Sequence, residues 1–341
     1  MQQGLTRRTL VTGAAALMLA PARAQDGFLV LRAADAVPGP VLRVKRGEEV
    51  RVRLTNDAPA PLSLHWHGVR VPNAMDGVPP LTQKPVGPGE SFDYRFTPPD
   101  AGTFWYRAPF GSGPYGALIV AEAAPVDVDR EMTLMLDGAT APDLAFGSNE
   151  RVRVRLINVG DRLATVSIER HPVRVMAIDG QPAEPFLARE GRITLAPGNR
   201  ADLFVDASFE PGTRHGEPKP LPANALPARM DFRGALRAEL DVSAVNASVP
   251  EKPLFSVKRG RTVQLAIRGG DTASSLHIHG HHVRLLDSLD DGWRPFWLDT
   301  ILVMPQAVTR VAWVADNPGK WLLHGRRIGN GAQSIAWFEV S

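Results

Sequence analysis

Two short segments of the chain carry paired histidines at a spacing suited to metal binding. They read Leu64-His65-Trp66-His67-Gly68 and Leu276-His277-Ile278-His279-Gly280. In an extended strand, residues i and i+2 point to the same side, so each segment aims two imidazoles at one point. Neutral imidazole is the commonest protein ligand for copper and zinc. Two such pairs, each followed by glycine and far apart in the chain, predict two halves of one metal site.

The absence of cysteine limits the chemistry of such a site. The 341 residues contain no Cys. The chain therefore cannot form disulfides, which exported proteins often use. It also cannot build a thiolate-ligated blue-copper centre, because the strongest ligand of that centre is a cysteine.

A repeated pattern indicates the elements that position these histidines. A turn followed by a strictly alternating strand occurs three times, at 44–54, 147–156 and 257–267. Such alternation is typical of strands with one buried face. A glycine-initiated aromatic strand occurs at 101–106 and again at 318–323. This domain-sized repeat predicts an all-β protein of three β-sandwich (Greek-key) domains, at 26–124, 125–245 and 246–341.

The N-terminus is typical of an export signal. Arg7 and Arg8 precede a short apolar run, and Ala22-Arg23-Ala24 is a cleavage signature. We interpret residues 1–24 as a cleaved twin-arginine signal peptide of a periplasmic protein. The apolar run is too short to cross a bilayer, so we expect no transmembrane segment. Without the signal's three arginines, Lys+Arg falls from 39 to 36 against 36 Asp+Glu, and we expect no nucleic-acid binding.

The motifs resemble those of multicopper oxidases of the laccase-like group. His65-Trp66-His67-Gly68, followed by residues 72–79, resembles the first copper motif of that family, and 102–106 resembles the lead-in to the second. His277-Ile278-His279-Gly280-His281 and residues 319–324 resemble the third and fourth. The resemblance covers nearly the whole mature chain. It implies three cupredoxin-like domains, a type 1 copper and a trinuclear copper cluster that reduces oxygen to water.

Several copper ligands that the resemblance implies are missing. The type 1 Cys position is Gly325, its two His positions are Ser274 and Asn330, and its axial position is Ile335. Of the eight cluster histidines, five survive. His65 and His277 match the ligands of the type 2 copper, His279 and His324 match two ligands of one type 3 copper, and His67 matches the other. The acid beside the type 2 site matches Asp76, and a second family acid falls on Gly331.

Two arginines stand at the positions of lost ligands. Arg107 and Arg326 take places that the resemblance assigns to ligands of the type 3 copper bound by His67. A guanidinium stays protonated and has no lone pair to give, so it excludes a metal. We expect both groups to lie near His67 and to pair with an acid, Asp76.

Three hypotheses follow for the function. The leading one is a copper-binding protein with a single ion at a mononuclear remnant site and no laccase activity. The second is a metal-free cell-envelope scaffold with a protein partner, resembling the divisome-stabilising cupredoxin protein, in which the five histidines bond to Asp76, backbone and water. The third is a copper-dependent oxidoreductase that uses only the remnant site, and the sequence names no substrate.

We expect His171 and His215 in surface turns, and His281 and His282 in packing or supporting roles.

Overall fold

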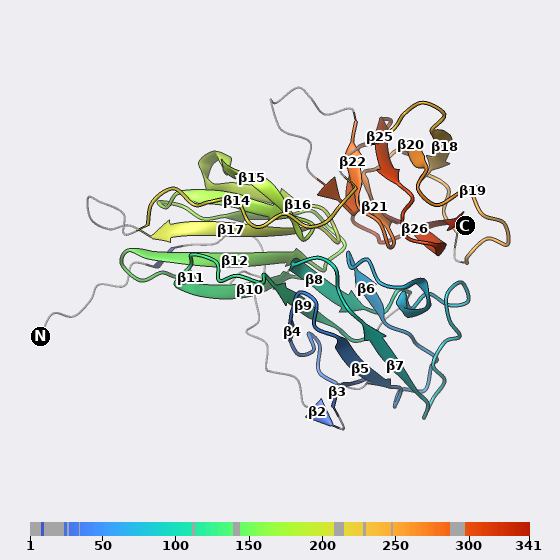
Figure 1. Ribbon diagram of the computed structural model, residues 1–341, viewed down its shortest axis with the longest axis horizontal. Helices are drawn as coiled ribbons and strands as arrows, with labels where there is room; N and C mark the ends of the chain where they lie inside the picture. Colours follow the sequence, from blue (N-terminus) through green and yellow to red (C-terminus); the bar gives the residue numbers. More distant parts are fainter. Residues whose placement is uncertain are drawn as a thin grey trace, which may run out of the picture.

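Strands account for nearly all of the regular structure. The computed structural model describes residues 8–9, 24–25, 27–33, 35–110, 113–138, 144–207, 215–227, 230–246, 248–286 and 297–341. The described strands form three β-sandwich units around a central junction (Figure 1), which confirms the all-β prediction. The expected signal peptide, 1–24, lies outside the described residues except for β1 (Arg8–Thr9) and Ala24 in β2 (Ala24–Gln25).

The first unit is a sandwich of two four-stranded sheets. One sheet has the order β2, β3 (Phe28–Arg32), β5 (Val50–Thr55) and β7 (Ser91–Phe96). The other has the order β4 (Leu42–Lys45), β9 (Tyr115–Ala121), β8 (Gly102–Arg107) and β6 (His65–His67). A single 3-10 turn, η1 (Asn73–Met75), leads into Asp76. The alternation predicted for residues 50–54 is observed, because Val50, Val52 and Leu54 are buried.

The second unit has a five-stranded sheet, a two-stranded sheet, and β11 (Leu144–Ala145), which pairs with β1. The larger sheet has the order β10 (Arg130–Leu136), β12 (Glu150–Asn158), β17 (Arg200–Ala207), β14 (Val173–Ile178) and β15 (Gln181–Leu187). The smaller sheet pairs β13 (Ala164–Ser167) with β16 (Arg192–Leu195), which follows η2 (Arg189–Gly191). The hydrophobic core of the second unit is a cluster separate from the core of the other two units.

The third unit contains two five-stranded sheets. The first has the order β18 (Leu236–Asp241), β20 (Thr262–Arg268), β25 (Val308–Val314), β22 (Val283–Leu285) and β23 (Trp297–Leu298). The second has the order β19 (Phe255–Val257), β27 (Gln333–Val340), β26 (Gly319–Arg327), β21 (Ser274–Ile278) and β24 (Thr300–Val303). Because β18 joins this unit, its sheet begins before the boundary we placed at residue 246.

The three copies of the predicted repeat occupy equivalent places. Each alternating strand, β5, β12 or β20, pairs in parallel with an earlier strand of its unit, β3, β10 or β18 respectively. Each also pairs antiparallel with β7, β17 or β25. The chain is therefore built from three related strand arrangements, as the repeat predicts.

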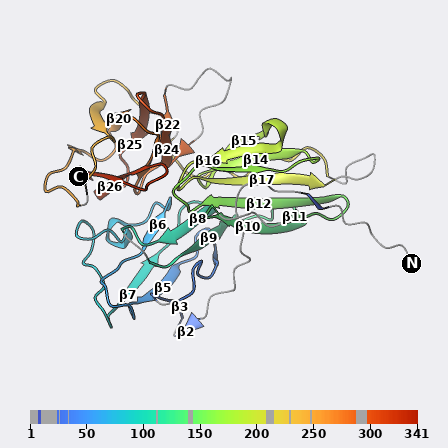
Figure 2. The same ribbon diagram turned by 180° about the vertical axis from the view of Figure 1, so that it is seen from behind.

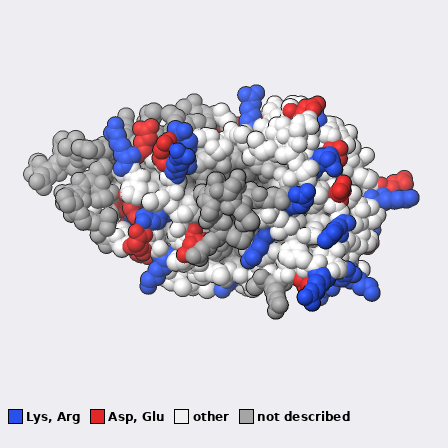
Figure 3. All heavy atoms as spheres, turned by 90° about the horizontal axis from the view of Figure 1, so that it is seen from above, with Lys and Arg blue, Asp and Glu red and all other residues white. Residues whose placement is uncertain are grey.

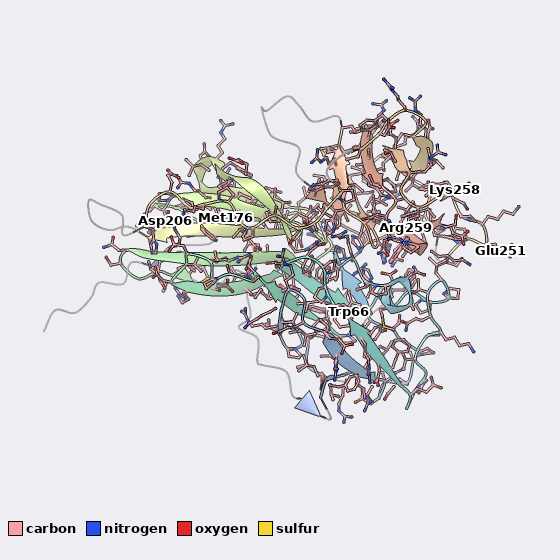
Figure 4. All side chains as sticks on the ribbon, viewed as in Figure 1. Trp66, Met176, Asp206, Glu251, Lys258 and Arg259 are labelled. Atoms are coloured by element: carbon pink, nitrogen blue, oxygen red, sulfur yellow. The ribbon has the colours of Figure 1, made fainter. Side chains whose placement is uncertain are left out.

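The first and third units share one continuous hydrophobic core. A single cluster of buried side chains includes Leu54 and Trp66 of the first unit and Trp313 and Trp321 of the third. Trp66, labelled in Figure 4, lies on β6 between the two histidines of the first motif. The opposite view in Figure 2 again places β6 beside the third unit. This shared core holds β6 against β21 and β26, the strands that carry the other histidines.

Two further observations concern the surface and the helices. On the face shown in Figure 3, Lys and Arg are interspersed with Asp and Glu over the described residues. Among the residues that the structure describes, no helix is long and apolar enough to cross a membrane.

Candidate metal centre

The two histidine pairs meet at the junction of the first and third units. His65 and His67 come from β6, whereas His277 lies next to the last residue of β21 and His279 follows that strand. His324 on β26 lies directly opposite His277 in the antiparallel register. All five side chains are buried. The structure thus brings together all five histidines singled out by the sequence.

The closest approach in the cluster is between His65 and His277. Their Nε2 atoms lie 3.1 Å apart, within the range of roughly 3–4 Å that two nitrogens reach when both bind one ion through bonds of about 2.0 Å. The other nitrogen of each ring, Nδ1, makes a hydrogen bond to a backbone oxygen. The Nδ1 of His65 donates to the backbone oxygen of Asp76 at 3.0 Å, and the Nδ1 of His277 donates to that of Asp299 at 3.1 Å.

These backbone bonds determine which nitrogen carries the proton. A carbonyl oxygen can only accept, so Nδ1 is the protonated nitrogen of each ring. In a neutral imidazole, Nε2 then carries a lone pair. His65 and His277 therefore direct two lone pairs at each other, an arrangement that a cation between them stabilises. Copper and zinc both fit this donor set, because both bind neutral imidazole.

His279 adds a third lone pair to the same space. Its Nδ1 donates to the Asp76 carboxylate at 3.0 Å, and its ring stacks on that of His65 with centroids 3.8 Å apart. Its Nε2 is buried and has no hydrogen-bond partner among the described residues. His65, His277 and His279 each offer a ligand atom within 4.8 Å of the others. These three histidines form the candidate metal centre.

Asp76 supports the metal centre from one side. Its carboxylate bonds to His279 and also lies 3.1 Å from the Nδ1 of His65. Burial opposes its ionisation, but the two histidines hold the pKa of Asp76 well below its usual range. Asp76 is thus a buried anion beside the candidate ligands, in agreement with the supporting role we expected for it.

His67 lies beside this group rather than in it. Its ring stacks on His277 with centroids 3.6 Å apart, and its Nε2 lies 3.0 Å from Thr300 Oγ1. The Thr300 hydroxyl donates to Asp299, so it accepts from His67 Nε2. The Nδ1 of His67 therefore has the lone pair, and it is buried without a partner within the described part of the chain. His67, His277 and Asp299 lie close enough to form a second ligand group, but the nitrogens nearest the carboxylate, His67 Nε2 and His277 Nδ1, carry protons in this arrangement.

His324 differs from the other four histidines. Arg107 Nη2 donates to His324 Nδ1 at 3.1 Å. Because a guanidinium cannot accept, the proton of neutral His324 must lie on Nε2. In this arrangement His324 presents an N–H group and not a lone pair. This departs from our expectation that it is a ligand.

The two arginines lie near the cluster, but not in the expected pairing. The charge of Arg107 acts on His67, as we expected. Asp76, however, bonds to His65 and His279, so the expected partner of the arginines is wrong. Burial and the nearby charge of Arg326 lower the pKa of Arg107 to about 9, which leaves it charged at neutral pH.

Burial keeps the histidines neutral, the form that binds metal. Desolvation lowers the pKa of His277 to about 4, even though Asp299 opposes the shift. Desolvation likewise lowers the pKa of His67 and of His279 well below the ordinary value. His67, His277 and His279 are therefore neutral imidazoles at neutral pH.

Asp299 supports the other side of the centre, and the sequence reading missed it. Its carboxylate lies 3.3 Å from His277 Nδ1 and receives two hydrogen bonds from Arg200, at 2.6 and 2.7 Å. Arg200 belongs to β17 in the second unit. Asp179, 3.6 Å from Arg200, accepts from the backbone N–H groups of Asp299 and Thr300. No local motif marks these residues, because their partners lie in other units.

The other histidines have local roles. His281 packs among Trp313, Trp321 and Phe338, and His282 lies 3.4 Å from the Asp299 carboxylate. His171 packs on Phe146, whereas His215 bonds to Asp129. These placements agree with the packing and turn roles that we expected.

The four positions that the sequence resemblance assigns to a type 1 centre carry Gly, Ser, Asn and Ile. Gly325 faces Ser334, and a Cβ added there would lie 3.1 Å from the Ser334 Cβ. Asn330 is exposed and accepts the backbone N–H of Ala332. Ser274 and Ile335 are buried. Neither a hydroxyl nor an aliphatic side chain replaces the thiolate and imidazoles of a blue-copper site.

Comparisons with known proteins agree with this architecture. Three family models, each described as multicopper oxidase, match residues 26–125, 111–213 and 223–326. The chain is 25% identical to the multicopper oxidase MmcO of Mycobacterium tuberculosis over 85% of this chain and 79% of that protein. A match to copper resistance protein A of Escherichia coli is 38% identical but covers 30% of this chain and 18% of that protein.

Solved structures give the same result. Lac15 from a marine microbial metagenome shares 32% identity over 89% of this chain and 92% of its own, with a TM-score of 0.75. A multi-copper oxidase from Pseudomonas thermotolerans shares 27% identity over 99% and 100% of the two chains, with a TM-score of 0.77. The three sandwiches are thus of the cupredoxin type. This chain belongs to the multicopper oxidase family.

Proposed function

We propose that this chain binds one copper ion on His65 and His277 and lacks the four-electron oxidase chemistry of a laccase. The observation that carries this proposal is the pair of Nε2 atoms, 3.1 Å apart and both held as lone-pair donors by backbone carbonyls. His279 is the nearest further donor. A bound copper supplies Lewis acidity and a one-electron redox couple. The chain supplies neutral ligands and the buried carboxylates of Asp76 and Asp299.

The proposed loss of oxidase activity rests on the missing ligands. With no cysteine in the chain, no thiolate–copper centre can collect electrons. Arg107 and Arg326 stand where two further cluster ligands are expected. We therefore expect purified protein loaded with copper to show no intense blue band and no oxygen-dependent oxidation of phenols or Cu(I). A strong blue absorption or four-electron oxygen reduction would contradict this part of the proposal.

Copper is favoured over zinc for two reasons. On imidazole sites, intrinsic affinity is highest for Cu(II). The relatives also include a copper resistance protein.

The N-terminal twin-arginine pattern supports a periplasmic location, where the protein would meet exported copper. Replacing Arg7 and Arg8 with Lys should keep the protein in the cytoplasm, and unchanged export would refute this route.

Metal analysis tests the copper site. Protein incubated with Cu(II) and then desalted should retain about one copper per chain, and the ion should raise the unfolding temperature. His65→Gln and His277→Gln should each abolish both effects. His171→Gln, on the second unit, is the matched control and should change neither.

The alternatives correspond to other outcomes of the same experiment. If the protein retains less than about a tenth of a copper ion per chain and shows no metal-dependent melting shift, the copper site is wrong. That result would favour the metal-free envelope scaffold. One bound copper with turnover of a reductant that His277→Gln abolishes would favour the third hypothesis, an oxidoreductase that uses the remnant site.

A further inference from the structure

Two arginines beside the metal centre form no ion pair at bonding distance with a carboxylate among the described residues. Arg107 donates one hydrogen bond, to His324, and its ring contact is with Trp105, whose centroid is 5.5 Å away. The side chain of Arg326, on β26, has no hydrogen bond or ion pair with any described residue, although the charge of Asp161 acts on it. Arg326 follows His324 by two residues on β26, so the two side chains lie on the same side of the strand, and the charge of Arg326 lowers the pKa of Arg107.

The two carboxylates of the metal centre are already engaged. Asp76 bonds to His65 and His279, whereas Asp299 forms a two-bond ion pair with Arg200. Neither carboxylate is available to Arg107. A buried or half-buried guanidinium without a counterion is costly, because its charge loses hydration and gains no partner.

Unused hydrogen-bond donors accompany this charge. Arg107 Nε is buried and has no hydrogen-bond partner among the described residues. The same holds for Nε2 of His324, a residue that is 2% exposed. Since Arg107 occupies Nδ1 of His324, this Nε2 carries a proton and must donate. Within the described part of the chain, two buried donors without acceptors therefore accompany two guanidinium groups that bond to no carboxylate.

We propose that Arg107, Arg326 and His324 form a binding site for a small oxyanion of the carboxylate class, such as formate or bicarbonate. Such an anion neutralises one charge and accepts from Arg107 Nε and His324 Nε2. Guanidinium groups present N–H donors in a planar fork that matches the two oxygens of a carboxylate. The burial of His324 and of Arg107 Nε limits the ligand to a few atoms. This site does not require copper, so it is independent of the proposed function.

The test uses metal-free mature protein, prepared with a chelator, and sodium formate as the probe. Formate at about 100 mM should raise the unfolding temperature by about 3 °C or more relative to sodium chloride at equal ionic strength. Arg107→Gln and Arg326→Gln should each remove this difference. The matched control is Arg268→Gln, an exposed arginine near Glu239, which should keep it. Titration of ¹³C-formate followed by NMR line broadening gives a second measure that does not depend on unfolding.

The possible outcomes separate the proposal from its alternatives. Formate-specific stabilisation and line broadening that both arginine variants lose would support the oxyanion site. Equal stabilisation by chloride would overturn the assignment to oxyanions. No effect of formate on the wild type, or an effect that survives in both arginine variants, would overturn the site itself. If Arg107→Gln does not fold, Arg326→Gln, at a half-buried position, still decides the result.

Discussion

Replacing Asp299 with Asn should separate the contribution of the second unit from that of the histidines. Asp299 and Arg200 are both fully buried and share hydrogen bonds of 2.6 and 2.7 Å. The Asn side chain keeps the size of Asp but removes the charge and turns an N–H group toward another donor. Removing one partner of a buried ion pair costs about 3–5 kcal/mol, because the other charge remains buried.

Asp179 determines where in this range each variant should fall. It lies 3.6 Å from Arg200, so Arg200 keeps one counterion in Asp299→Asn. The loss of stability should then be near the lower limit, about 3 kcal/mol. In Arg200→Gln, Asp179 and Asp299 remain buried together without a cation, and the loss should approach about 5 kcal/mol. The loss of stability in the double variant should be smaller than the sum of the losses in the two single variants.

Urea unfolding of the metal-free protein measures these differences. Asp93→Asn is the control, because Asp93 forms a comparable two-bond pair with Arg53 at a half-exposed site, where the loss should stay below about 1 kcal/mol. Copper affinity should also fall in Asp299→Asn by roughly 10-fold, since Asp299 orients His277. Additive losses in the double variant, or equal losses for Asp299→Asn and Asp93→Asn, would refute the reasoning.

Three further predictions concern single groups in or near the site. Long-range ¹H–¹⁵N NMR of metal-free protein should show His324 with its proton on Nε2, because Arg107 donates to Nδ1; a proton on Nδ1 would contradict this. Burial lowers the pKa of His277 to about 4, so only the unfolded chain gains a proton as pH falls from about 6.5 to 4. Stability in urea should then fall across this window, about 3 kcal/mol of this loss should be missing in His277→Gln, and an equal loss in both proteins would refute the shift. Gly325→Cys should give copper-loaded protein no intense blue band, since the new Cβ would lie 3.1 Å from that of Ser334 and the other strong ligands are missing; a blue product would show that a type 1 centre can still form.

Much of the architecture could be predicted from local patterns. The alternating residues 50–54, 151–156 and 262–267 form β5, β12 and β20, because a period of two buries one face of a strand. Not all polar positions in these repeats face solvent, however. Arg151, Arg153 and Arg155 of β12 are buried among acids such as Asp202 and Glu131. Periodicity predicts a strand but not what covers its second face.

The histidine motifs likewise could be predicted from the sequence only in part. The sequence alone determined that His65 and His67 share a strand, that His277 and His279 form a second pair, and that no thiolate can join them. Those properties depend on residue type and on spacing along one chain segment. They were sufficient to predict a metal site made of two halves.

Only the tertiary structure decided how these nitrogens are used. The carbonyls of Asp76 and Asp299 direct the lone pairs of His65 and His277 at each other, whereas Arg107 converts His324 into a donor. Asp299 is held by Arg200 from another unit. Proton positions and charge partners depend on which groups meet across domain interfaces, and local periodicity carries no information about such contacts.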